Sequence, residues 1–248
     1  MKKFLTSAAL VFASTPVFAL DATPLFSVYG GVGSWSTEVS GDLGDSETDV
    51  NDLGLGDESN NYIYVAFEHA VPFIPNVRLE RSAISSSGDS VLTDVFVFGD
   101  SSFDADVATE IDITMTDAVL YYEIAMVDFG LTFRQFDAEV SAVGTIEGTE
   151  ETESEEVDGV LPMLYVQTKI DLPFTGLYVT GNANAISVDD KSIIDYRAAV
   201  GYGIEIPVIA EIGLELGYRA FEIDLGDDED FAGNIEFSGV YFGANVKF

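Results

Sequence analysis

The chain closes with Gly239-Val240-Tyr241-Phe242-Gly243-Ala244-Asn245-Val246-Lys247-Phe248. Apolar residues occupy every second position, and alternation at period two places them on one face of a β-strand. A last strand that ends on an aromatic residue is typical of bacterial outer-membrane β-barrels, in which the apolar row faces lipid. A soluble β-sandwich can also end on an amphipathic strand, so the remaining sequence must discriminate. We expect the barrel-assembly machinery to recognise this row as an assembly signal, which comprises Val240, Phe242, Ala244, Val246 and Phe248.

The N-terminus has the pattern of a secretory signal peptide. Lys2 and Lys3 precede a short apolar core over Phe4–Ala13, and Val17-Phe18-Ala19 forms a small-residue cleavage site. The apolar core is shorter than the roughly 20 residues that a membrane-spanning helix needs. We therefore predict a signal peptide over residues 1–19 and one barrel domain over residues 20–248. The chain contains no cysteine, which excludes disulfides and a lipoprotein anchor.

Charge and hydropathy differ in a way that favours a membrane barrel. The chain has 44 Asp and Glu against 10 Lys and Arg, a net charge of −34, yet 47% of its residues are hydrophobic. The acids are concentrated in blocks, and the apolar residues lie in alternating segments between the blocks. So strong an acidic field argues against binding nucleic acid.

Ten amphipathic segments recur along the chain, separated by turn signals. Their connections alternate between short, mostly Pro-marked turns and mostly longer acidic loops such as Ser40–Asn60, Ser141–Glu156 and Gly226–Asn234. Outer-membrane barrels have this organisation, with turns in the periplasm and loops outside. We predict an all-β, antiparallel up-and-down transmembrane barrel of ten strands, with eight or twelve as alternatives if a hairpin near Ser85–Asp106 is miscounted. The segments are Leu25–Val39, Asn61–Val71, Val77–Phe98, Ala105–Ile124, Val127–Val140, Val157–Ile170, Leu177–Val188, Ser192–Ile206, Glu211–Leu225 and Ile235–Phe248.

Parity along the segments separates an outer face from an inner face. Four apolar rows are predicted to face lipid: Ile63, Val65 and Phe67; Phe129, Leu131 and Phe133; Tyr196, Ala198, Val200 and Tyr202; and Ile212, Leu214, Leu216 and Tyr218. The opposite rows are charged. We predict a lumen charge network of Glu68, Arg78, Glu80, Asp117, Glu123, Asp128, Arg134, Lys169, Asp195, Arg197, Glu215, Arg219 and Lys247.

This charged lumen has two interpretations. In the first, the ions pair with one another and fill a narrow barrel, since barrels of about eight strands are filled by side chains. In the second, they line a narrow cation-preferring channel with an acidic mouth. We favour the first, a non-enzymatic structural or surface barrel, and keep a small cation-preferring porin as the alternative.

Other chemistry has little support in the sequence. The single histidine, His69, lies beside Glu68 at the predicted periplasmic end of its strand, and no G-x-S-x-G nucleophile motif is present. The acidic loops lack the EF-hand spacing. We therefore predict no catalytic residue, no specific metal site and no cofactor. We expect the loops to recruit divalent cations diffusely, and these cations would bridge the protein to lipopolysaccharide.

Several short motifs together resemble an uncharacterised family of Gram-negative outer-membrane β-barrel proteins. The likeness covers nearly the whole mature length, and it implies a barrel in the cell outer membrane in contact with its lipid. It implies no catalytic residues. The motifs are Tyr29-x-Gly31-x-Gly33-x-Trp35, Glu68-His69, Val71-Pro72, Pro75–Leu79, Thr116–Ile124, Pro162–Tyr165, Asp171–Gly176, Leu214–Arg219 and Gly239–Phe242.

Overall fold

The computed structural model describes residues 25–43, 48–92, 95–99, 101–103, 106–146, 149–189, 191–207, 210–224, 226 and 233–248. The predicted signal peptide lies outside these residues. Within them, no helix is long and apolar enough to cross a bilayer.

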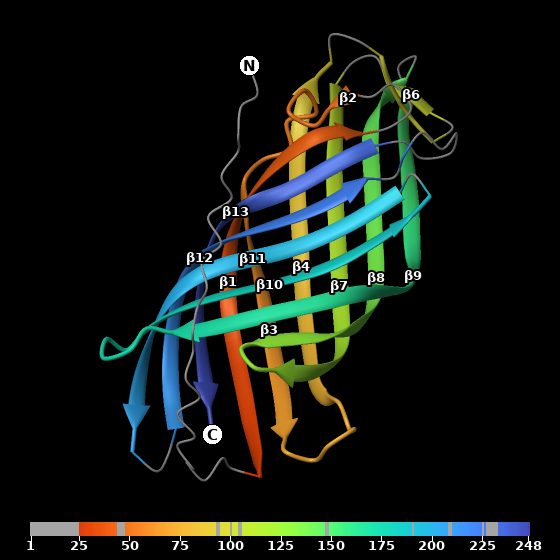
Figure 1. Ribbon diagram of the computed structural model, residues 1–248. Coiled ribbons are helices and arrows are strands. Elements are labelled where there is room, and N and C mark those ends of the chain that lie inside the picture. The colour runs from red at the N-terminus through yellow and green to blue at the C-terminus, as the bar shows by residue number, and fades with distance from the viewer. Residues whose placement is uncertain are drawn as a thin grey trace, which may run out of the picture.

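Ten long antiparallel strands form a closed barrel (Figure 1). Each strand pairs with the next one in the chain order of the ten, and the last strand pairs with the first, so the sheet has no open side. The prediction of a ten-stranded up-and-down barrel is thereby confirmed. The strands are β1 (Phe26–Leu43), β3 (Glu58–His69), β4 (Asn76–Val91), β7 (Asp106–Ile124), β8 (Val127–Ile146), β9 (Thr149–Asp171), β10 (Leu177–Val188), β11 (Lys191–Ile206), β12 (Ala210–Asp224) and β13 (Gly233–Lys247).

The strands are strongly staggered around the barrel. When directly paired residues are followed from Val28 through all ten strands, the path returns to β1 at Ser40, twelve residues further along. Such a shear requires the strands to tilt by about 35–45° from the barrel axis. The tilt is visible in Figure 1.

Three short strands lie at the loop end: β2 (Thr48–Asp49), β5 (Phe96–Phe98) and β6 (Ser101–Phe103). They correct one predicted boundary. The expected strand Val77–Phe98 ends at Val91, and β5 instead pairs with β6 in a separate hairpin. The reason is burial, because Phe96, Phe98 and Phe103 fold into the apolar interior and are at most 1% exposed.

A second correction concerns the acidic segment Ser141–Glu156, which was expected to be a loop. Most of it is strand, because β8 and β9 remain paired out to Ile146 and Thr149. Among the described residues, β9 has no second neighbour over Thr149–Met163, since its pairing with β10 begins only at Leu164. β4 and β7 extend as far, since Val91 pairs with Asp106 and Val107 pairs with Gly144, so the wall of β4, β7, β8 and β9 projects beyond β10 at the loop end.

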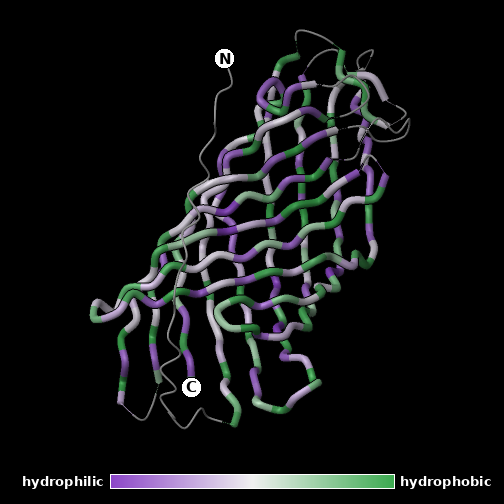
Figure 2. Tube along the Cα trace, viewed as in Figure 1, coloured by the Kyte–Doolittle hydropathy of each residue, from purple (hydrophilic) through white to green (hydrophobic). Residues whose placement is uncertain are grey.

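The outer surface carries the predicted lipid-facing rows. The four rows assigned by parity are all exposed on the outside of the barrel, as are Val240 and Phe242 of the closing strand. Figure 2 shows hydrophobic and hydrophilic residues alternating along the strands. An apolar exterior with closed backbone pairing is the arrangement that hydrocarbon permits, because lipid offers no hydrogen bonds to a free edge.

The alternation reverses its phase part of the way along the strands. On β8, Phe133 faces outward, whereas Phe136 and Val140 are buried inside and the outward positions become polar, as at Asp137. β7, β12 and β13 switch in the same way. The turn-side half is therefore apolar outside, and the loop-side half is apolar inside. Only a change of surroundings from lipid to water explains both halves, since apolar surface is buried wherever water is the alternative.

Tyrosine rings fill the space above glycines on neighbouring strands of the inner wall. A β-carbon at Gly201 would overlap the ring of Tyr178, and one at Gly33 would overlap that of Tyr62. The glycines thus let bulky rings lie flat against the wall. Tyr178 is held there by donating a hydrogen bond to Glu215 at 3.0 Å and accepting one from Asn245 at 3.0 Å.

We expect Gly201→Ala to destabilise the refolded barrel by about 1–3 kcal/mol, the usual effect of overpacking a well-packed interior. The added methyl group must displace the ring of Tyr178 and its two hydrogen bonds. Gly159→Ala is the matched control, because a β-carbon there meets nothing within 4 Å. Urea unfolding followed by Trp35 fluorescence measures both variants, and equal stabilities would contradict the packing role.

Candidate functional site: the barrel lumen

The lumen consists of three layers along the barrel axis. A polar vestibule lies at the turn end, a layer of arginines and carboxylates crosses the middle, and an apolar layer fills the loop end. The phase reversal of the strands produces this order, because inward positions are polar in the turn-side half and apolar in the loop-side half.

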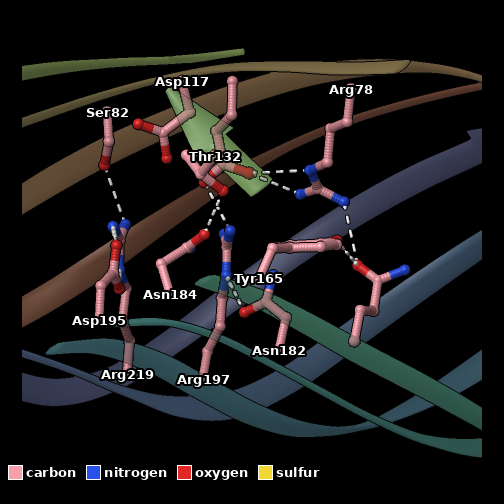
Figure 3. A network of polar contacts seen from close by, with 12 residues as sticks. Arg78, Ser82, Asp117, Thr132, Tyr165, Asn182, Asn184, Asp195, Arg197 and Arg219 are labelled. Atoms are coloured by element: carbon pink, nitrogen blue, oxygen red, sulfur yellow. Dashed lines mark hydrogen bonds and ion pairs between the residues drawn. The ribbon is translucent and has the colours of Figure 1, made fainter. Parts of the chain in front are cut away.

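The middle layer joins opposite walls of the barrel. Arg197 on β11 donates to Glu80 on β4 at 2.5 Å, and these two strands are five places apart in the ring of ten. Glu80 also accepts from Arg78 at 2.6 Å, while Arg197 donates to Asn182 at 3.0 Å. Figure 3 shows Arg78 on one wall and Arg197 with Asn182 on the other. One carboxylate therefore holds two guanidinium groups at the centre of the lumen.

A second chain of contacts runs beside the first. Arg134 forms a two-pronged pair with Asp117 at 2.8 and 2.7 Å and also contacts Asp195 at 2.8 Å. Asp195 accepts from Arg219 at 3.0 and 2.9 Å, and Arg219 reaches Ser82 across the lumen at 2.9 Å. All five side chains are buried. Paired charges are the form in which a barrel of this width can hold arginine away from water, although Nη1 of Arg134 is buried without a hydrogen-bond partner.

The remaining residues of the predicted network lie toward the turn end. Glu68 accepts from Tyr121 at 2.9 Å, and Asp128 accepts from Gln167 at 3.2 Å. Glu123 is exposed and lies opposite Asp128, and Glu215 accepts hydrogen bonds from Tyr178 and Asn245. Lys169 pairs with Glu211 at 3.3 Å, and the ammonium group of Lys247 lies 5.0 Å from the ring centre of Tyr29. Seven of the thirteen predicted residues thus meet in the middle layer, and six surround the vestibule.

The vestibule encloses a cavity of about 110 Å³. Tyrosines make up much of its wall, and sequence parity alone did not single them out as a group. The signal that could have found them is the repeated facing of tyrosine and glycine on neighbouring strands. The tyrosines that line the cavity are Tyr29, Tyr62, Tyr64, Tyr121, Tyr178 and Tyr241.

The loop-side layer is an apolar plug, which the sequence analysis did not anticipate. Strand residues supply its base, where the ring of Trp35 packs 4.7 Å from the Arg219 guanidinium and so joins the plug to the charged layer. Segments from the loop end fold over it. The most deeply buried members, each at most 1% exposed, include Trp35, Leu43, Val50, Leu53, Phe96, Phe98, Phe103, Phe221 and Phe237.

The structure gives His69 a role in its turn. Its backbone N–H donates to Asn76 at 2.9 Å, and its Nδ1 accepts from the backbone N–H of Val71 at 3.2 Å. Among the residues that the structure describes, no group of three His, Asp or Glu side chains is placed to hold a metal ion.

A closed barrel with an apolar outer belt and a charged interior defines the class of protein: an antiparallel transmembrane β-barrel of the outer-membrane type. No protein-family model matches the chain, and no curated protein matches it. Among solved structures, the chain is similar to Ail, the attachment invasion locus protein of Yersinia pestis, whose crystal structure contains the heparin analogue sucrose octasulfate. The two share 10% sequence identity with a TM-score of 0.38, over 90% of this chain and 99% of Ail.

Removing Asp195 should destabilise the barrel by about 3–5 kcal/mol, because Asp195→Ala leaves Arg134 and Arg219 buried without their shared carboxylate. Asp171→Ala is the control. It removes an exposed contact to Lys169 at 3.8 Å, and such pairs contribute about 0–1 kcal/mol. Denaturant titration of both refolded variants tests the difference, and a small loss for Asp195→Ala would mean that the charged layer is not a stabilising network.

Proposed function

We propose that the protein is a non-conducting, non-enzymatic barrel of the outer membrane that presents a rigid acidic structure at the cell surface. The observation that carries this proposal is the filled lumen. Two layers of different chemistry cross it: the arginine–carboxylate layer, in which Arg197 and Glu80 join opposite strands, and the apolar plug above it. An ion would have to displace both.

The β8–β9 hairpin, which belongs to the projecting wall, supports a role outside the membrane. Its β9 strand exposes Glu150, Glu151, Glu156 and Asp158 on a paired, ordered framework rather than on a loop. Carboxylates at this density attract divalent cations, and such cations can bridge to the anionic groups of lipopolysaccharide. We therefore propose lipid, lipopolysaccharide and diffusely held divalent cations as its surroundings, and the barrel-assembly machinery as its route into the membrane.

Planar-bilayer recording with the refolded protein under a KCl gradient tests the proposal. We expect no discrete current steps from inserted protein, with insertion verified by the heat-dependent gel mobility of protein recovered from the membrane. A known porin in the same membranes shows that steps would be detected. Regular steps with a cation-directed reversal potential would instead establish the narrow cation-preferring channel.

A further inference from the structure

The short turns at one end of the barrel expose large apolar side chains at their tips. Phe73, between β3 and β4, is 94% exposed, and Phe174, between β9 and β10, is 108% exposed. Met126, in the turn between β7 and β8, is 63% exposed. Turns that face water usually carry polar residues and glycine, because the exposure of an aromatic ring to water is unfavourable and no contact offsets it there.

These turns also carry a conformational cost. Phe73 and Phe174 follow Pro72 and Pro173 and have φ angles of 66° and 67°, while Ala125 has φ of 61°. Positive φ at the residue after proline is the place of glycine or asparagine in a type II turn. An L-residue with a side chain is strained there. Turn geometry alone would therefore favour glycine or asparagine over phenylalanine at both positions.

The apolar belt on the strands varies in height around the barrel. On β8 the outward row runs from Val127 to Phe133, where the phase of alternation reverses. Seven residues at a tilt of about 40° cover roughly 18 Å along the barrel axis. The apolar band of an outer-membrane barrel is about 25 Å tall. On β8 the remaining height lies at the turn that carries Met126, whereas on β11 the exposed outward row from Tyr196 to Ile206 covers about 28 Å without a contribution from its turn.

We infer that the turn-side rim formed by Phe73, Met126 and Phe174 is a lipid-anchoring surface that inserts into the interfacial region of the periplasmic leaflet. The inference rests on the proposed membrane location and adds the depth at which the barrel sits. Beside Phe174 the rim joins the belt, because Leu172 and Leu177 flank the ring and are themselves exposed. Its partner is the boundary between acyl chains and headgroups.

Glycine substitution separates lipid contact from turn strain. Ala125→Gly removes strain and little surface, so it should raise the folded-to-unfolded ratio in vesicles about two- to fivefold. Phe174→Gly and Phe73→Gly remove the same strain together with a ring that has almost no contact with the protein. If lipid covers the rings, both variants should lower that ratio about tenfold. If water covers them, both should stabilise the barrel as Ala125→Gly does, and the inference would be wrong.

Fluorescence quenching locates the tips directly. The chain has no cysteine, so Phe73→Cys and Phe174→Cys each accept one environment-sensitive label. In phosphatidylcholine vesicles, both labels should be quenched by spin-labelled lipid and protected from aqueous iodide. Leu131→Cys on the belt is the lipid-facing control, and Asp112→Cys on the loop-side half is the aqueous control. Iodide quenching at both tips with lipid quenching at residue 131 would overturn the rim inference alone. Iodide quenching at residue 131 as well would overturn the membrane location, and the inference with it.

Discussion

The rest of the structure depends on closure of the hydrogen-bonded ring between β13 and β1. In hydrocarbon a free strand edge would expose backbone groups without partners, at several kcal/mol for each group. Closure with ten strands and a shift of twelve residues fixes the width of the lumen and the tilt of the wall. Every inward side chain must then fit a space whose size is already determined. That fixed width explains why tyrosine rings lie over Gly33 and Gly201. It also explains why arginine side chains are long enough to reach across the centre.

The chain meets two solvents, and its strands adapt to both without a break. In the turn-side half the exterior is apolar and the interior holds paired charges. In the loop-side half the exterior is polar, and Phe136, Phe221 and Phe237 pack inside as in a soluble barrel. The two halves share one hydrogen-bond register, although the pairing of β1 with β13 is interrupted at Ser36 and Thr37. The change from one half to the other requires that the apolar residues move from one parity to the other.

The sequence predicted the architecture well because lipid-facing alternation is a local signal. The rows at Phe129–Phe133 and Ile212–Tyr218, the proline-marked turns and the strand number all follow from it. The interior was less accessible. Parity identifies Arg197 and Glu80 as inward-facing, but only the register around the whole ring places them opposite each other. The apolar plug was missed for a different reason. Beyond Phe133 the hydrophobic period remains two, but the apolar residues move from the outward to the inward positions. A prediction that assigns one apolar face to the whole strand does not detect this change.

The overhang of β9 has a consequence for encounters between copies of the protein. Over Thr149–Met163 its backbone groups on one side meet no second strand among the described residues, which is the geometry through which sheets join edge to edge. The exposed carboxylates along it, such as Glu151 and Glu156, give two such edges the same sign of charge. Repulsion between copies therefore opposes fibre-like stacking, and it is strongest in dilute salt, where the screening length is greatest.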